Sequence, residues 1–146
     1  YLASTYRPQP WYPTTPRAMA QITEWLAFAA SWVQYGVFSA RALVAFGIPA
    51  NGLPPDFPAS LPEAQHRGRR SLDILETHLG GQDWLVSPQP TIADIAVLPY
   101  VALAPMGNIE LTPYPAVEAW IARFKALPGF VSIPGLDDPR YRATAG

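Results

Sequence analysis

The sequence predicts an all-α domain with almost no β-sheet, on the basis of three observations. Apolar residues recur at intervals of three and four along several segments, which is the period of a helix that buries one face. Helix start and stop signals, such as Thr15-Pro16 and Gly80-Gly81, flank these segments. The Asn51-Gly52 pair stands between prolines, and not between the alternating runs that a β-hairpin needs. A helical bundle is therefore the expected fold class.

The composition is typical of a single soluble domain. The chain has 146 residues, 49% of them hydrophobic, with a net charge of −1, so it can form a core but offers no basic surface for nucleic acid or anionic membranes. The absence of cysteine excludes thiolate nucleophiles and cysteine-bound zinc. Residues 1–10 show no signal-peptide pattern, and the stretch 25–40 is too polar to span a membrane. We expect a soluble, cytoplasmic protein.

The first predicted helix is the longest and runs from Thr15-Pro16 to Gly47, with threonine as N-cap and proline in the first turn. Its apolar residues form two stripes. The first contains Leu26, Ala29, Val33, Val37 and Val44, and the second contains Phe28, Trp32, Tyr35, Ala42 and Phe46. Phe38 falls near a polar face marked by Thr23, Gln34 and Arg41. So wide an apolar arc indicates either a helix buried all round or an aromatic stripe that faces a subunit, a second domain or an apolar ligand.

Two further helices have clear boundaries. After a proline-rich loop over 47–62, Ser60 and Glu63 have the spacing of a capping box, and Gly80-Gly81 ends that helix. The last helix starts at Tyr114-Pro115 and continues to Leu127, and an extended tail follows it.

Thr91 and Asp94 are the polar residues of an otherwise apolar segment, 91–100. A threonine at the N-cap accepts from a backbone N–H of the first turn, and an acid three residues later accepts from the N–H of the threonine. A catalytic threonine would instead need a base beside it, and an aspartate with an ordinary pKa is a poor one. The pair is therefore predicted to start a helix and not to carry chemistry.

The remaining candidate groups do not form a site. His66 and His78 lack an acidic or histidine partner at the spacing that metal ligation favours, so they are predicted to lie at the surface or at a helix end. Asp137 and Asp138 lie in a Pro/Gly-rich tail and are predicted to form a solvated turn. We expect no metal and no catalytic residue in this chain.

The order of several short motifs resembles the C-terminal helical domain of glutathione S-transferases. The motifs are Leu72-Asp73-Ile74-Leu75-Glu76 with Leu79, Trp84-Leu85, Thr91-Ile92-Ala93-Asp94-Ile95, Tyr114-Pro115 with Val117 and Trp120, and Leu127-Pro128-Gly129-Phe130. The Thr-Ile-Ala-Asp segment is similar to the N-capping box of that family. Residues 1–6 resemble the end of the last helix of the family's thioredoxin-like domain. The resemblance covers nearly the whole chain.

This resemblance implies a bundle of about five helices and three regions. Residues 1–10 would be the remnant of a thioredoxin-like domain, 11–130 the helical domain and 131–146 an extended tail. The thioredoxin-like domain of the same polypeptide would bind and activate glutathione, while the helical domain lines the pocket for a small apolar electrophile and helps to form a homodimer. The substrate-binding positions carried over are Trp32, Gln34, Tyr35 and Phe38. The alternative is a non-catalytic protein-interaction module of the same fold.

Overall fold

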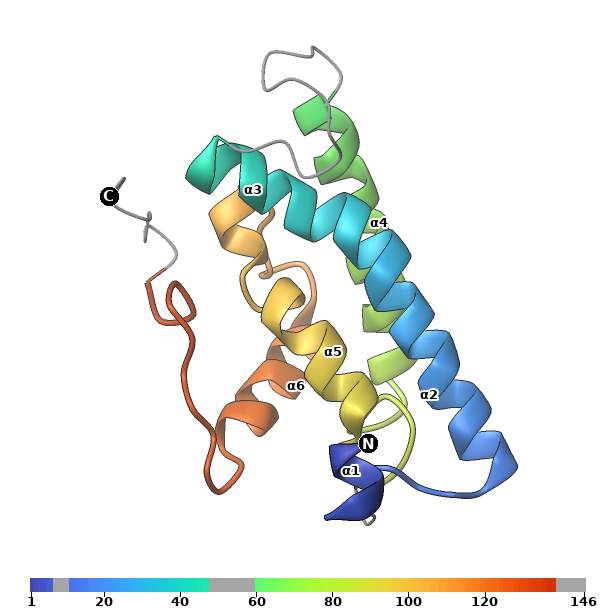
Figure 1. Cartoon of the computed structure of the whole chain (residues 1–146). Helices are drawn as coiled ribbons and strands as arrows, with labels where there is room; N and C mark the ends of the chain where they lie inside the picture. Colours follow the sequence, from blue (N-terminus) through green and yellow to red (C-terminus); the bar gives the residue numbers. More distant parts are fainter. Residues whose placement is uncertain (7–10, 48–59, 139–146) are drawn as a thin grey trace.

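A computed structural model describes residues 1–6, 11–47 and 60–138, and Figure 1 shows their arrangement. The elements are α1 (Leu2–Thr5), α2 (Pro16–Phe28), the π-helical segment η1 (Ala29–Phe38), α3 (Ser39–Phe46), α4 (Ser60–Leu79), α5 (Ile92–Val101), the 3₁₀ turn η2 (Ala104–Gly107) and α6 (Pro115–Lys125). Because α2, η1 and α3 are continuous, they form one long helix. With α1, α4, α5 and α6, the described residues thus contain five helices and no strand, which confirms the predicted fold class.

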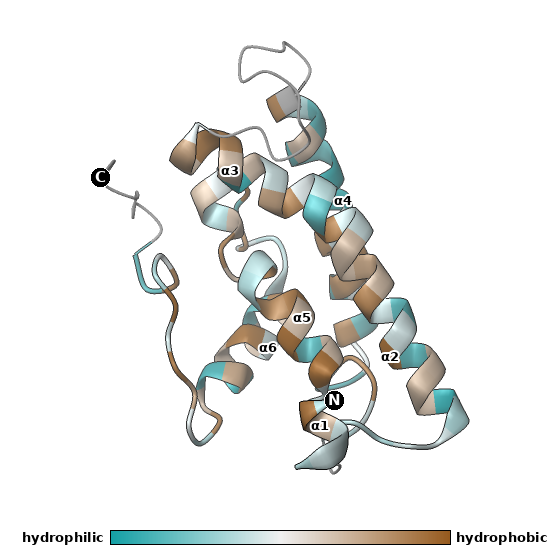
Figure 2. Ribbon diagram, in the orientation of Figure 1, coloured by the Kyte–Doolittle hydropathy of each residue, from teal (hydrophilic) through white to brown (hydrophobic). Residues whose placement is uncertain are grey.

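The long helix and α4 pack side by side, and α5 lies against the long helix in the middle of the molecule (Figure 1). The core between these helices contains the fully buried side chains of Val33, Leu72, Val97 and Trp120. Figure 2 shows α5 as mainly hydrophobic, whereas α4 begins with a hydrophilic stretch. Among the described residues, no helix combines the length and the apolar character that crossing a bilayer requires.

Both predicted ends of the long helix are confirmed. The Thr15 hydroxyl accepts from the N–H of Ala18 at 3.3 Å, and Pro16 occupies the first turn. At the other end Gly47 takes the left-handed conformation, with a φ of 64°, which glycine adopts without steric cost.

The middle of the long helix differs from the prediction. Over Ala29–Phe38 the turns are π-helical, and the carbonyl of Gln34 accepts from both the backbone N–H and the hydroxyl of Ser39, the latter at 2.9 Å. A π turn contains more residues than an α turn, so side chains beyond it are rotated relative to a regular helix. The faces deduced for a regular helix were therefore partly wrong: Val44 is only half-buried, and Ala42 and Ala45 are buried instead.

Two glycines allow the π-helical segment and α4 to cross at backbone contact. A Cβ added to Gly36 would lie 2.6 Å from the backbone nitrogen of Gly68. A Cβ added to Gly68 would lie 2.5 Å from Cδ1 of Ile109. Backbone atoms of α4 leave no room for a side chain at Gly36, so the close crossing depends above all on this glycine.

α6 begins at Pro115, directly after Tyr114, as predicted, and α4 also begins at the predicted position. Ser60 is the first residue of α4, and its predicted bond with Glu63 lies outside the described side chains; Glu63 pairs with Arg67 at 2.8 Å. At the start of α6, the carboxylate of Glu76 accepts from the N–H groups of Ala116 and Val117, each at 3.0 Å. A side chain of α4 thus caps α6 from a distance in the sequence.

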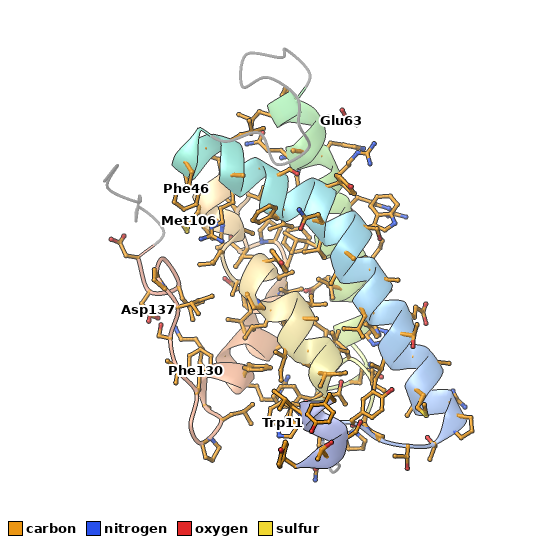
Figure 3. All side chains as sticks on the ribbon, viewed as in Figure 1. Trp11, Phe46, Glu63, Met106, Phe130 and Asp137 are labelled. Atoms are coloured by element: carbon orange, nitrogen blue, oxygen red, sulfur yellow. The ribbon has the colours of Figure 1, made fainter. Side chains whose placement is uncertain are left out.

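The C-terminal segment follows α6 along one side of the molecule, without helix up to Asp138. Figure 3 shows Phe130 and Asp137 along this segment. The ring of Phe130 packs against Phe124 of α6, with centroids 6.2 Å apart. Lys125 donates to Asp137 at 2.5 Å, and this hydrogen bond lowers the pKa of the Asp137 carboxyl. The segment is therefore attached to the bundle at several points. The predicted tail beyond 138 and most of the predicted loop over 47–62 lie outside the described residues.

Candidate functional site

The pair Thr91 and Asp94 lies at the centre of a buried hydrogen-bond network. One carboxylate oxygen of Asp94 accepts from the N–H and the hydroxyl of Thr91, at 2.8 and 3.1 Å. The other accepts from the N–H of Leu85 and from the indole N–H of Trp120, both at 3.0 Å. The Thr91 hydroxyl in turn accepts from the N–H of Ala93 at 3.3 Å, so the predicted capping box is present.

This network leaves Asp94 no free lone pair for chemistry. Both Thr91 and Asp94 are fully buried, and each carboxylate oxygen already accepts two hydrogen bonds. A general base must reach a substrate proton with an available lone pair. The carboxylate instead connects three parts of the structure, which are the loop before α5, the start of α5, and α6. It therefore stabilises more of the fold than the predicted helix cap would.

The four predicted substrate-binding residues occupy different surroundings along the long helix. Trp32 and Tyr35 remain 44% and 50% exposed, so the helix is not buried all round. Gln34 is half-buried, and its carbonyl belongs to the π turn described above. Phe38 is half-buried and packs edge to face on Tyr100 of α5, with ring centroids 5.5 Å apart.

A pocket of about 450 Å³ lies beside the Phe38–Tyr100 contact; we call it the Arg41 pocket. It is formed by α3, α5 and the C-terminal segment, and its described lining residues are Arg41, Phe46, Pro99, Tyr100, Leu103, Ile133 and Pro134. Figure 3 shows Phe46 near the end of α3. The volume of the Arg41 pocket falls in the range of small-molecule sites, and the pocket lining combines apolar side chains with few polar ones.

Arg41 is the charged residue of this lining. Its guanidinium lies 5.3 Å from the ring centroid of Phe46, a distance suited to a cation–π contact. The Nε atom is buried and has no hydrogen-bond partner. Burial lowers the pKa of Arg41, although arginine stays protonated at neutral pH. Sequence reasoning placed Arg41 on a polar face and did not connect it with a pocket.

Two other apolar depressions lie elsewhere. One, of about 330 Å³, contains Trp11 and Ile95, together with Phe130 and Val131 of the C-terminal segment. The other lies between the long helix and α4, where Trp25 stacks near His78 with ring centroids 4.6 Å apart. His78 also bonds the carbonyl of Leu85 at 2.9 Å, so it belongs to a helix end, as predicted. Across the described residues, no group of three or more acidic or histidine side chains could hold a metal ion.

Comparison with known proteins agrees with this architecture. The family model for the glutathione S-transferase C-terminal domain matches residues 37–128. The chain belongs to the glutathione S-transferase family. A crystal structure of a glutathione S-transferase from Xanthobacter autotrophicus Py2 superimposes with a TM-score of 0.79 and 37% identity, covering 88% of this chain and 61% of that one.

Two curated relatives match most of this chain. Glutathione S-transferase D6 of Drosophila melanogaster is 28% identical over 82% of this chain and 52% of its own length. Elongation factor 1-gamma of Danio rerio is 29% identical over 84% of this chain and 27% of its own length. The chain thus spans about half of the length of the first relative and about a quarter of the second.

Proposed function

We propose that this chain is the helical domain of a glutathione transferase that conjugates or reduces apolar electrophiles. A thioredoxin-like domain of the same polypeptide would bind glutathione and activate its thiol, so the helical domain alone is expected to be inactive and to bind no cofactor. The full protein would be a cytoplasmic homodimer that acts in detoxification. The family match over residues 37–128 is the main support for this proposal.

In this proposal the four predicted residues form one wall of the electrophile site. Phe38 is held by Tyr100, and Gln34 lies in the same π-helical segment. Trp32 and Tyr35 are about half-exposed in this chain, which suits side chains whose other contacts come from a second domain, a second subunit or the substrate. The site would therefore be closed only in the complete protein.

The test is a glutathione-conjugation assay on the full-length protein, with a neutral aryl halide as electrophile. Trp32→Ala and Tyr35→Ala should each raise the KM for the electrophile roughly fivefold or more and leave the KM for glutathione nearly unchanged, because they remove apolar contact area. Met19→Ala is the matched control, since Met19 is 40% exposed on the same long helix outside the proposed wall. A full-length protein without conjugation activity would overturn the proposal.

The second candidate is a non-catalytic interaction module, in which Trp32 and Tyr35 contact another protein. Two observations favour it: the likeness to elongation factor 1-gamma, and the exposure of both aromatic side chains. Under this alternative, the two alanine variants would shift the equilibrium between monomer and dimer in analytical ultracentrifugation. Conjugation would be absent in the wild-type protein as well.

A further inference from the structure

We propose that the Arg41 pocket binds the carboxylate of a small, otherwise apolar ligand, which makes an acidic aromatic compound the preferred class of substrate. Calling this compound a substrate rests on the proposed function, but its binding to the pocket does not. The proposal is carried by three features of the pocket: a cation that no described residue pairs, an apolar remainder and a suitable size.

Among the residues that the structure describes, no acidic side chain pairs with Arg41. The described residues form three ion pairs, which are Arg67–Glu63, Arg123–Asp83 and Lys125–Asp137. None of them includes Arg41, and none of the described lining residues is acidic. Arg41 is half-buried, and partial removal of its charge from water has a cost that a counter-charge would offset. The π-face of Phe46 offsets only part of that cost.

In the part of the chain that the structure describes, no group accepts a hydrogen bond from Nε of Arg41. Nε is shielded from solvent and has no hydrogen-bond partner. Because Nε itself is out of reach, an anion in the pocket would bind the terminal N–H groups of Arg41, which is one of the lining residues. A carboxylate fits best, since arginine presents a planar set of N–H donors that matches its geometry.

The rest of the pocket selects an apolar body. Apart from Arg41 and Tyr100, its described lining consists of Phe46, Pro99, Leu103, Ile133 and Pro134. These side chains offer water few hydrogen bonds, so an apolar group gains by displacing it. A volume of about 450 Å³ accommodates one or two aromatic rings, but not a polymer.

The experiment compares two ligands with the same ring system by isothermal titration calorimetry on the full chain. Naphthalene-2-carboxylate carries the charge, and naphthalene-2-carboxamide is its neutral counterpart. The wild-type protein should bind the carboxylate roughly tenfold or more tightly, because charge-assisted hydrogen bonds are about twice as strong as neutral ones. Arg41→Gln should bring the ratio of the two affinities close to one, and Arg41→Lys should retain part of the preference.

Two further variants make the result decisive. Arg70→Gln removes the same charge from an exposed position on α4 and should keep the wild-type ratio. Ile133→Glu places a carboxylate in the pocket wall and should abolish the preference without altering Arg41, which tests the idea even if Arg41→Gln unfolds. Equal binding of the two ligands by the wild-type protein, or an unchanged ratio in Arg41→Gln or Ile133→Glu, would overturn the proposal.

The outcome is separable from the proposed function, because calorimetry needs neither glutathione nor a thiolate. A protein that prefers the carboxylate but does not conjugate would remove the transferase proposal and leave the pocket assignment. A protein that conjugates neutral aryl halides but shows no carboxylate preference would remove the pocket assignment and leave the transferase proposal.

Discussion

The substitution Asp94→Ala should destabilise the fold far more than the loss of a helix cap alone. Loss of the capping interaction at Thr91 costs about 1–2 kcal/mol. The carboxylate also accepts from Leu85 and Trp120 in the core. Without it, each of these buried N–H donors loses its acceptor, at about 1–3 kcal/mol apiece. Since neighbouring terms do not add fully, we expect a total of about 3–5 kcal/mol.

That total is a large share of the stability of an ordinary domain, which is about 5–15 kcal/mol. For a chain of 146 residues it corresponds to a fall in Tm of roughly 10–15 °C. The measurement is urea unfolding followed by circular dichroism, comparing wild type with Asp94→Ala. Glu110→Ala is the control, because Glu110 is an exposed acid, and we expect it to change the free energy of unfolding by less than about 0.5 kcal/mol.

A double-mutant cycle with Trp120→Phe tests the mechanism. In the wild-type background this change leaves one carboxylate lone pair of Asp94 unpartnered, whereas in Asp94→Ala there is no acceptor to lose. Trp120→Phe should therefore cost about 1–2 kcal/mol less in the Asp94→Ala background. A cost for Asp94→Ala below about 1 kcal/mol, or no coupling to Trp120, would refute the reasoning.

Two stability predictions concern the helix contacts. Gly36→Ala should lower the free energy of unfolding by about 2 kcal/mol or more, measured in urea, because its Cβ would lie 2.6 Å from the nitrogen of Gly68; an unchanged midpoint would show that the helices separate easily. Glu76→Gln keeps one acceptor for the N–H groups of Ala116 and Val117, and should cost about 1 kcal/mol, against about 2 for Glu76→Ala. Equal losses in the two variants would contradict a capping role for Glu76.

Local signals in the sequence predicted the parts of the fold that depend on neighbouring residues. Thr15 and Gly47 mark the ends of the long helix, and Thr91 with Asp94 starts α5, because caps act over three or four residues. The capping of α6 by Glu76 could not be predicted in this way. It joins residues some forty positions apart, and only the tertiary packing of α4 on α6 brings them together.

The π-helical segment explains why the candidate site was only partly predictable. A wheel with 100° per residue assumes regular α-helical turns, but Ala29–Phe38 contains wider ones. Phe38, the last residue of the segment, meets Tyr100, and Arg41 beyond it lines a pocket, although the wheel placed Phe38 near the polar face and Arg41 on it. The signal that the sequence does contain is Ser39, whose hydroxyl bonds the carbonyl of Gln34 at 2.9 Å.

The same segment links the fold to the proposed chemistry. The wider turns rotate α3 relative to a regular helix and so help to set the direction of Arg41, which lines the pocket with Phe46, Pro99 and Ile133. π turns are frequent at functional sites because they reposition side chains without breaking the helix. The irregular turns end at Phe38, shortly before Arg41, so the position of Arg41 in the pocket lining depends on them.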